Sequence, residues 1–550
     1  MTPFLRGEKV DKVKLFILLA IGSTAYYLLL QWSYFEPVGI KNITVDQYKP
    51  NTEKVIIDSE DLLTISQPSP KTLVDTSDLE SSFAAEELYV ISNNVLILKV
   101  DPVSGAFVRA ELLGMKTSLN SEQNITLFDF QGDNYYRANS GFFSADVGYL
   151  KPNFSSLSSE ESGDSVSFVL VSSIKDLSYK RTIVLYKDRY DVLVIDEIKN
   201  QGGLGSLKIT PYQTIERNAT EVESGFMTYA YLGPVFSTDS DKYNKIGFDD
   251  LEEKPFSEMS VGGWSSIIQH YFLSAWIPDQ SKKYLYQAKK KEDGIYSVGL
   301  AGETITLNPG KSFSSSQTLF VGPKIPENLD LVQENLGLAV DYGWLFWLGK
   351  PLYWVLNFGF SIFGNWGLAI IFLTVSLKLL LWPLSAAAYK SMAKMRALSP
   401  KLQELQAIHG SDKQKFSQEM MSLYQKEGVN PLGGCLPMLA QMPFFLAFYW
   451  VLIETVELRH APFVFWIVDL SQKDPYFILP LLNAAGMYYS QTLTPTPPNA
   501  DPMQAQMMKY MPLVFSVMFC FFPAGLVLYW LMNMLVTLIQ QLYYLRPGLK

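Results

Sequence analysis

A single lysine interrupts one of the most apolar stretches of the chain. The stretch reads LTVSLKLLLWPL, residues 373–384, and the lysine is Lys378, with Thr374 one helical turn before it. A lysine at the centre of a membrane helix costs about 2.5–3.5 kcal/mol, so it needs either headgroups within reach of its stem or a wet cavity inside a helix bundle. Ser385 lies seven residues further on, so an unbroken helix would place Thr374, Lys378 and Ser385 on one polar face. This face favours the cavity, and a lysine that snorkels to the cytoplasmic headgroups is the alternative.

Two other apolar stretches contain polar residues that suit such a cavity. Gln441 lies in CLPMLAQMPFFLAF, and Asn533 lies in LVLYWLMNMLV close to Trp530. None of the apolar stretches has an aspartate or glutamate near its middle. Because buried carboxylates mark proton relays and cation pathways, their absence argues against both. Lys378 therefore has no evident counter-ion, and we expect an acidic group to arrive with a substrate.

Five long apolar runs predict a polytopic α-helical membrane protein with six spans. The runs cover residues 15–35, 364–384, 432–453, 476–493 and 507–544, and each is long enough to cross about 30 Å of hydrocarbon as a helix. Pro523 and Gly525 interrupt the last run, which is too long for one crossing, so we expect two crossings there. Lysines and arginines in short loops stay in the cytoplasm. The basic residues 1–14, the basic loop 386–430 and the basic tail therefore predict cytoplasmic termini and an external polar domain. Five spans, which would leave Lys550 outside, are the alternative.

The long polar segment between the first two runs carries the acidity of the chain. Residues 36–345 contain 27 Lys and Arg against 43 Asp and Glu, whereas the net charge of the whole chain is −9. An acidic domain does not suit nucleic acid, whose phosphates attract basic patches. Residues 1–35 predict an uncleaved N-terminal anchor, with a cleaved signal peptide as the alternative, and residues 36–85, rich in Ser, Thr, Pro and acids, predict a flexible linker.

Residues 86–340 predict an all-β sandwich. Apolar and polar residues alternate in NNVLILKVD, SVSFVLVSS and KRTIVLYKDRYDVLVIDEI, and the last of these suggests a hairpin that turns at residues 187–189. The segment has no cysteine and only one histidine, His270, so it has no disulfide framework and no Cys/His zinc site. It also lacks the G-x-S-x-G and H-E-x-x-H motifs. We therefore expect a structural or binding domain with no catalytic residue, metal or cofactor.

An aromatic segment leads from this domain into the second run. Residues 341–363 are dense in Trp, Tyr and Phe and contain Lys350 followed by Pro351. This composition favours an amphipathic helix that lies in the membrane interface, because a lysine and a proline in mid-run argue against the alternative of a seventh span.

The basic loop predicts a cytoplasmic helical hairpin over residues 386–430. Ser411 is the expected N-cap of its second helix, and Gly428 is the expected residue after its C-terminus. Met420 belongs to an apolar stripe that either holds the hairpin together, which is favoured, or offers a deformable surface to partners. The hairpin also carries basic residues that form either a solvated face or a functional one: Lys390, Lys394 and Arg396.

Several long motifs give the chain a family resemblance. The segments SMAKMRALSPKLQEL, NPLGGCLPMLAQMPFFLAFYW, ELRHAPFVFWIVDLSQKDPYFILPLL and FPAGLVLYWLMN closely resemble the bacterial YidC membrane protein insertase family. The match is dense over residues 340–545, and an N-terminal anchor followed by a large external β domain resembles the Gram-negative form. The resemblance therefore extends over the whole chain.

The resemblance implies a site and partners. In the family, five core spans, here expected at residues 364–545, form a hydrophilic groove that is open to the cytoplasm and to lipid. A positive residue in the groove, usually arginine, attracts acidic parts of a substrate; Lys378 stands at that position, and Thr374, Gln441 and Trp530 match other groove positions. The implied partners are nascent membrane proteins, the Sec translocon, the lipid bilayer and, weakly because the tail after residue 545 is short, the ribosome. The implied location is the bacterial inner membrane, with a periplasmic β super-sandwich.

Two other classes of protein fit the sequence less well. A small-solute transporter would show inverted repeats and broken helices at the midplane, and no paired halves are visible. An intramembrane protease would need a catalytic dyad inside the spans, whereas His409 and His460 both lie in predicted loops. The sequence therefore predicts an insertase and chaperone that is not an enzyme.

Overall fold

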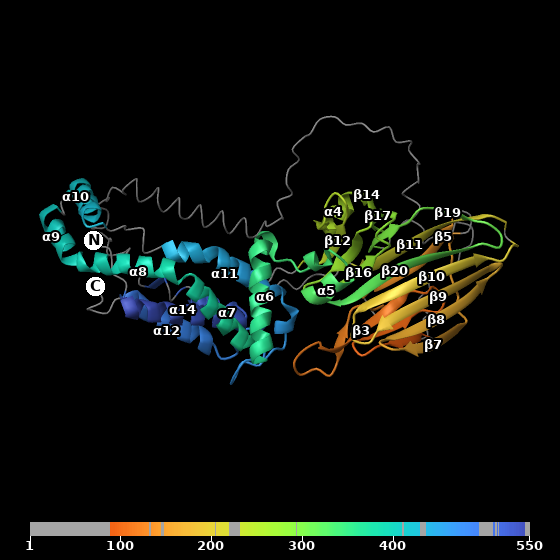
Figure 1. Ribbon diagram of the computed structural model, residues 1–550, viewed down its shortest axis with the longest axis horizontal. Helices are drawn as coiled ribbons and strands as arrows, with labels where there is room; N and C mark the ends of the chain where they lie inside the picture. The colour runs from red at the N-terminus through yellow and green to blue at the C-terminus, as the bar shows by residue number, and fades with distance from the viewer. Residues whose placement is uncertain are drawn as a thin grey trace, which may run out of the picture. The chain divides into compact units, whose positions relative to one another are not determined.

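The computed structural model describes residues 88–544 except for short gaps at 131–133, 145–147, 204, 219–230, 293, 410–411, 429–435, 494–509, 512–513 and 515 (Figure 1). The predicted N-terminal anchor 1–35, the predicted linker 36–85 and the basic tail after Tyr544 lie outside the described residues. The strands fall within residues 89–323, called the β domain below, and the long helices fall within residues 346–544, called the helical region.

Two antiparallel sheets form the β domain. The first has the strand order β1 (Tyr89–Ser92), β2 (Leu96–Val100), β3 (Phe107–Lys116), β5 (Tyr136–Ser144), β11 (Leu207–Asn218), β18 (Ile295–Ala301), β17 (Lys283–Lys290), β14 (Phe256–Val261), with β4 (Asn124–Thr126), β6 (Gly148–Tyr149) and β19 (Ile305–Leu307) at its sides. The second has the order β13 (Asn244–Lys245), β12 (Gly233–Ser237), β15 (Trp264–Ile268), β16 (Phe272–Ile277), β20 (Ser312–Pro323), β10 (Asp191–Asn200), β9 (Leu177–Tyr186), β8 (Ser165–Ile174), β7 (Ser156–Ser162).

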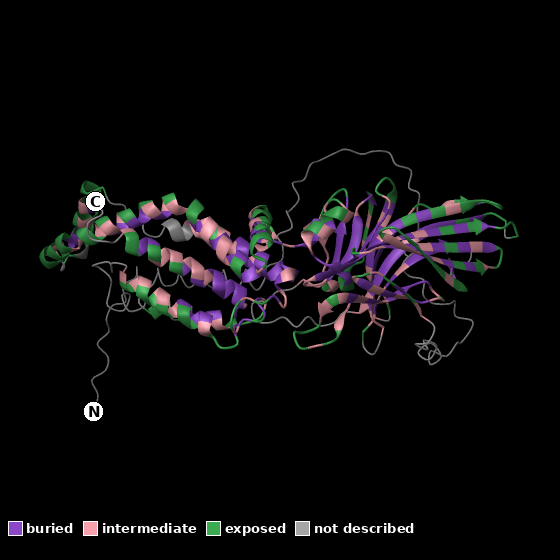
Figure 2. Cartoon of the chain, turned by 60° about the horizontal axis from the view of Figure 1, so that its bottom comes forward, coloured by how far each residue is buried: buried purple, intermediate pink, exposed green. Residues whose placement is uncertain are grey.

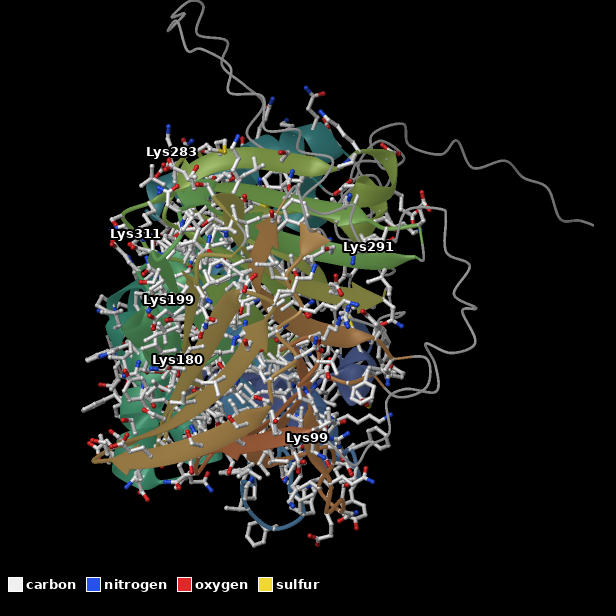
Figure 3. All side chains as sticks on the ribbon, turned by 90° about the vertical axis from the view of Figure 1, so that its right-hand side faces the viewer. Lys99, Lys180, Lys199, Lys283, Lys291 and Lys311 are labelled. Carbon is white, nitrogen blue, oxygen red and sulfur yellow. The ribbon has the colours of Figure 1, made fainter. Side chains whose placement is uncertain are left out.

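The alternation in the sequence explains how the two sheets pack. In β9 every second residue is buried, and β10 pairs with it in the register Val194 to Ile183, across the turn predicted at residues 187–189. Buried and exposed bands alternate along the strands in Figure 2, while Lys180 and Lys199 point outward in Figure 3. The indole of Trp276 on β16 donates a hydrogen bond of 3.1 Å to the carbonyl of Thr214 on β11 in the other sheet. The expectation of two packed sheets is confirmed.

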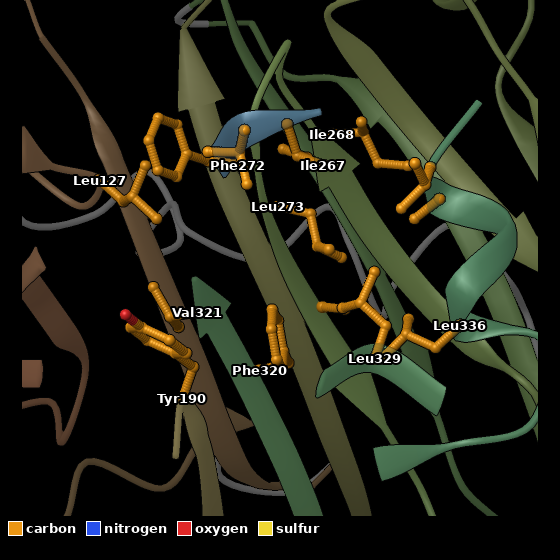
Figure 4. Close-up of a cluster of buried hydrophobic side chains, with 14 of the residues drawn as sticks. Leu127, Tyr190, Ile267, Ile268, Phe272, Leu273, Phe320, Val321, Leu329 and Leu336 are labelled. Atoms are coloured by element: carbon orange, nitrogen blue, oxygen red, sulfur yellow. The ribbon is translucent and has the colours of Figure 1, made fainter. Parts of the chain in front are cut away.

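Short helices cover one end of the second sheet. Helix α5 (Pro326–Val332) and the 3-10 turn η1 (Leu336–Ala339) bring Leu329 and Leu336 against Leu273 and Phe320, all fully or almost fully buried (Figure 4). A further helix, α4 (Phe248–Glu253), lies against β17. The apolar core therefore runs from the strands into the segment that leads to the helical region.

The helical region consists of apolar helices and a polar hairpin. Its elements are the turn η2 (Gly343–Leu345), α6 (Phe346–Phe363), α7 (Trp366–Leu380), α8 (Trp382–Ala397), α9 (Ser399–His409), α10 (Lys413–Lys426), α11 (Leu436–Glu454), η4 (Val456–Leu458), α12 (Ile478–Leu493), η5 (Phe519–Phe521) and α14 (Ala524–Tyr544). One face of α6 is exposed and aromatic, with Trp347 and Trp354 both more than half exposed, as an interfacial helix requires.

We expect one straight helix from the second apolar run, but the structure shows a bent one. It breaks at Leu381, and α7 and α8 are bent by 64° relative to each other. Pro383 is the second residue of α8, where its missing N–H is harmless to the new helix but leaves the preceding turn one hydrogen bond short. Ser385 therefore belongs to a different helix from Lys378. The single polar face predicted from the i+7 spacing is not formed.

The number of membrane spans stays a prediction. By length and composition one described helix, α14, is long and apolar enough to cross a membrane, or two if the bent pair α7 and α8 counts as one span. Helix α11 contributes a shorter apolar segment, Ala440–Glu454. Helix α14 begins directly after Pro523, which confirms the break predicted in the last run. The predicted domain boundaries likewise stay predictions.

The polar hairpin differs from expectation at one cap. Asp412, not Ser411, is the N-cap of α10, because its carboxylate accepts from the backbone N–H groups of Gln414 and Lys415. An aspartate at this position also interacts favourably with the positive end of the helix dipole. Gly428 follows the helix with φ +62°, as predicted for the residue after its end.

Candidate functional site

A small pocket surrounds Lys378 between three helices. It is too narrow to admit a water molecule, and its walls come from α7 and the residue that follows it, from α11 and from α14: Thr374, Leu377, Lys378, Leu381, Gln441, Tyr529 and Asn533. Four of these seven residues were predicted site residues. The structure therefore brings together Lys378, Thr374, Gln441 and Asn533 from segments that lie more than 150 residues apart at the extremes.

Neutral side chains hold the ammonium group of Lys378. Its Nζ donates to Oε1 of Gln441 at 3.1 Å and to Oγ1 of Thr537 at 2.8 Å. Lys378 is 4% exposed, and no acidic residue in the described part of the chain forms an ion pair with it. An ammonium group has three donors, so two neutral acceptors leave one N–H available. The site is a desolvated cation with weak compensation, and one of its N–H groups has no acceptor among the described residues.

Local helix geometry aims the lysine into the pocket. Asn365 caps α7, its side chain accepting from the N–H of Leu368 at 3.0 Å, and this fixes where the helix starts. Thr374 lies on the pocket face one turn before Lys378 and bonds its own helix, donating to the Ile370 carbonyl at 2.7 Å. Helix α7 ends at Leu380, two residues after Lys378. The lysine therefore projects from the last turn of a helix, a position that favours a cation electrostatically.

Trp530 does not line this pocket, and its place in a substrate groove stays a prediction. Its ring packs edge-on against Phe445 at 4.7 Å and lies 5.0 Å from Phe519. The reason is helical geometry, because Tyr529 is the residue that lies one turn before Asn533 on the pocket face. The indole N–H of Trp530 is buried and finds no hydrogen-bond partner among the described residues.

Thr537 is the functional candidate that sequence reasoning missed. It lies four residues after Asn533, accepts the shortest bond from Lys378, and donates in turn to the Asn533 carbonyl at 2.8 Å. The i+4 spacing of Asn533 and Thr537 on an apolar helix was the signal that could have revealed it. Tyr529, four residues before Asn533, follows from the same spacing.

The hairpin residues lie apart from this pocket. Lys390, Lys394 and Arg396 are exposed on α8. Met420 instead packs into the hairpin's own small core with Leu398 and Tyr424, as the favoured interpretation of the apolar stripe predicts. An ion pair of 2.8 Å between Lys401 and Glu427 closes the hairpin at its open end. No cluster of His, Cys, Asp or Glu in the described residues has the arrangement of a metal site.

The chain thus combines a domain of two packed sheets with a helical region that buries a cation. Sequence comparison defines the class of protein. A family described as 60Kd inner membrane protein matches residues 358–549, and the YidC periplasmic domain matches residues 88–355.

Individual relatives agree with these matches. The Membrane protein insertase YidC of Marinomonas sp. (strain MWYL1) is 38% identical over 97% of this chain and 98% of that protein. The protein of the same name from Shewanella halifaxensis (strain HAW-EB4) is 43% identical over 83% of this chain and 85% of that protein. A solved structure titled "Active YidC insertase crystal structure with the first transmembrane domain resolved" aligns with 82% of this chain and 92% of that chain, at 17% identity and a TM-score of 0.36. On the sequence matches, the chain belongs to the YidC family, in the form that has a periplasmic domain.

Proposed function

We propose that this chain is a membrane protein insertase and chaperone of a bacterial inner membrane, and that Lys378 attracts acidic groups of the substrate. Relatives that match nearly the whole chain are named membrane protein insertases, which supports the general activity. The observation that carries the site assignment is the buried ammonium of Lys378, whose hydrogen-bond partners among the described residues are the neutral side chains of Gln441 and Thr537. A buried cation that stabilised the fold would be expected to have a carboxylate beside it.

A substrate carboxylate would complete this site. At 4 Å and an effective dielectric constant near 20, an ion pair is worth roughly 4 kcal/mol before the cost of removing water from the carboxylate. Lys378 can form it by exchanging the neutral acceptors for the substrate's oxygen. The polar flank of a substrate is thus held within the bundle while its apolar segment partitions into lipid. The membrane potential adds about 2.3 kcal/mol per translocated charge per 100 mV.

Lysine at this position implies charge recognition without a fixed geometry. A guanidinium would bind a carboxylate through two parallel hydrogen bonds, whereas an ammonium acts as a compact charge with rotatable donors. We therefore expect Lys378 to tolerate varied positions of the substrate's acidic group. The same proposal includes a topology with six spans, cytoplasmic termini and an external β domain. It also includes cooperation with the Sec translocon.

Charge reversal tests the electrostatic role. Cells depleted of the protein are complemented with Lys378→Arg, Lys378→Met or Lys378→Glu, and the insertion of a short membrane protein with an acidic N-terminal segment is followed by protease protection. We expect Arg to support insertion and Glu to reduce it by about tenfold, which corresponds to about 1.4 kcal/mol.

A matched substrate provides the control. The same membrane protein with its N-terminal acids changed to lysines should insert better with Lys378→Glu than with the native residue. If both substrates respond alike to Lys378→Glu, the electrostatic role is wrong although the insertase activity stands. If depletion leaves the insertion of both substrates unchanged, the proposed activity itself is wrong.

A further inference from the structure

The loop between α11 and α12 carries an exposed aromatic side chain at a strained position. Phe465 is 90% exposed, and its φ of +55° lies in the left-handed region. A bulky residue in that region costs roughly 1–2 kcal/mol, and leaving its ring in water forgoes a burial free energy of similar size. Glycine would avoid both costs. A residue that is unfavourable for the fold on two counts suggests a contact outside the fold.

The loop that presents Phe465 is folded. The N–H of Phe463 donates to the Ile467 carbonyl at 3.0 Å, and the N–H of Ile467 donates to the Val464 carbonyl at 3.2 Å, which closes a tight turn with Phe465 at its tip. The ring of Trp466 stacks on that of Phe465 at 6.1 Å, and its indole donates to Asp474 at 2.9 Å. The exposure of Phe465 is therefore built into the turn.

Hydrogen bonds tie this loop to the ends of two helices. Asn365, the N-cap of α7, donates to the carbonyls of Pro462 and Phe463 at 3.3 and 3.2 Å. At the start of α14, Gly525 donates to the Leu470 carbonyl at 2.9 Å. The loop thus lies at the level where apolar helices begin, next to the end of α6.

The outward face of the loop is apolar and almost uncharged. Asp469 and Asp474 are 5% and 2% exposed and accept hydrogen bonds from within the loop, so they do not contribute surface charge. Within residues 455–477, all of which the structure describes, Lys473 is the one charged residue in the exposed class. The exposed apolar residues of this face and of the neighbouring helix end, called the apolar rim, are Ile362, Phe363, Val464, Phe465, Val468, Tyr476 and Phe477.

We propose that the apolar rim inserts into the headgroup–acyl boundary of the bilayer leaflet next to the β domain, with Phe465 as the deepest anchor. Aromatic side chains favour this boundary. The single exposed lysine suits lipid phosphates, whereas the inward-facing acids avoid them. Burial of the ring in the boundary offsets the backbone strain at Phe465. The anchor fixes the height of the α7 and α14 starts in the membrane, and this role is separate from charge recognition at Lys378.

Spin-label accessibility tests the anchor in the full-length protein in lipid vesicles. Cys435 and Cys520 are the only cysteines, so Cys435→Ser and Cys520→Ser give a background in which Phe465→Cys carries the one nitroxide label. Because Phe465 is 90% exposed and the indole of Trp466, on which its ring stacks, is held separately by Asp474, we expect this substitution to leave the fold intact. We expect the label to be several-fold more accessible to oxygen than to a water-soluble nickel chelate, relative to a label in water.

Two further sites calibrate the measurement. A label at Val171→Cys, on an exposed position of β8, reports water, and a label at Leu481→Cys, 70% exposed on α12, reports lipid. A label at position 465 that matches the one at position 171 overturns the proposal. A label at position 465 that is shielded from both reagents reports contact with a second copy or another protein, and it overturns the proposal equally.

Discussion

The β domain and the helical region each bury a cation, and they treat it in opposite ways. Arg181 on β9 is fully buried and forms an ion pair of 2.6 Å with Asp196 on β10. Asp196 also accepts from the hydroxyl of Tyr179 at 2.8 Å and from the side-chain amide of Gln317 at 2.7 Å. Lys378 is almost as buried, but its hydrogen bonds reach only an amide oxygen and a hydroxyl.

The difference separates a buried charge that stabilises the fold from a buried charge that is available to bind a ligand. The carboxylate of Asp196 and its neighbours satisfy Arg181 within the chain, so nothing is left to bind. The buried charge of Lys378 is compensated incompletely, because neutral dipoles stabilise a full charge less than a carboxylate does. A buried cation without a counter-ion therefore marks a site of interaction more reliably than burial of a cation alone.

The largest expected effect tests the satisfied cation. Asp196→Ala should lower the free energy of unfolding by about 3–5 kcal/mol, because it leaves Arg181 buried without its carboxylate. Denaturant unfolding of the full chain in detergent, followed by the near-ultraviolet signal of the β domain, measures it. Glu161→Ala removes an exposed ion pair with Lys187 and should change the same quantity by about 1 kcal/mol at most. Equal effects of the two substitutions would show that the buried pair of Arg181 and Asp196 stabilises the fold no more than an exposed ion pair does.

A third base, His270, is partly buried and extends the comparison to the pH dependence of stability. The Nε2 of His270 donates to the Ile453 carbonyl at 3.1 Å, so this base also has a neutral partner. Burial, with a smaller contribution from Lys324, lowers the pKa of His270 from 6.5 to about 4. Between pH 6.5 and pH 4, His270 therefore binds a proton in the unfolded chain but not in the folded chain. The contribution of His270 to the free energy of unfolding is therefore fully present above pH 6.5. The free energy of unfolding falls by about 3 kcal/mol as the pH drops to 4.

Thermal unfolding across that pH range measures the loss. His270→Gln keeps an N–H donor for the Ile453 carbonyl and has no titration, so its stability should vary less between pH 6.5 and pH 4 than that of the native chain. Parallel pH profiles for the two proteins would show that His270 is not the group responsible.

The smallest expected effect on stability belongs to Lys378. Lys378→Met replaces the ammonium by an apolar group of similar length and should change the free energy of unfolding by no more than about 1 kcal/mol, or stabilise the chain. Insertion of substrates with acidic segments should nevertheless fall. A loss of stability as large as that of Asp196→Ala would mean that Lys378 has a structural role, and the contrast between the two cations would disappear.

Much of the fold was predictable because it follows local periodicity. The alternation in β9 and β10 predicted both the hairpin and the burial of its inward residues. Pro523 predicted the start of α14, and Gly428 predicted the end of α10. Each of these depends on residues that are neighbours in sequence. The caps were less predictable, since Ser411 and Asp412 are both good N-cap residues and the chain path selects one.

The site was predictable in its residue types but not in its geometry. The sequence alone shows that Lys378 lies in an apolar segment, that Gln441 and Asn533 lie in two others, and that none of these segments supplies an acid. That Thr537 accepts from the lysine and that Trp530 faces an aromatic cluster became visible with the tertiary structure. Pro383 favours the break at Leu381, which keeps Ser385 out of the pocket, but packing between helices far apart in the sequence sets the helix rotations and therefore which side chains meet.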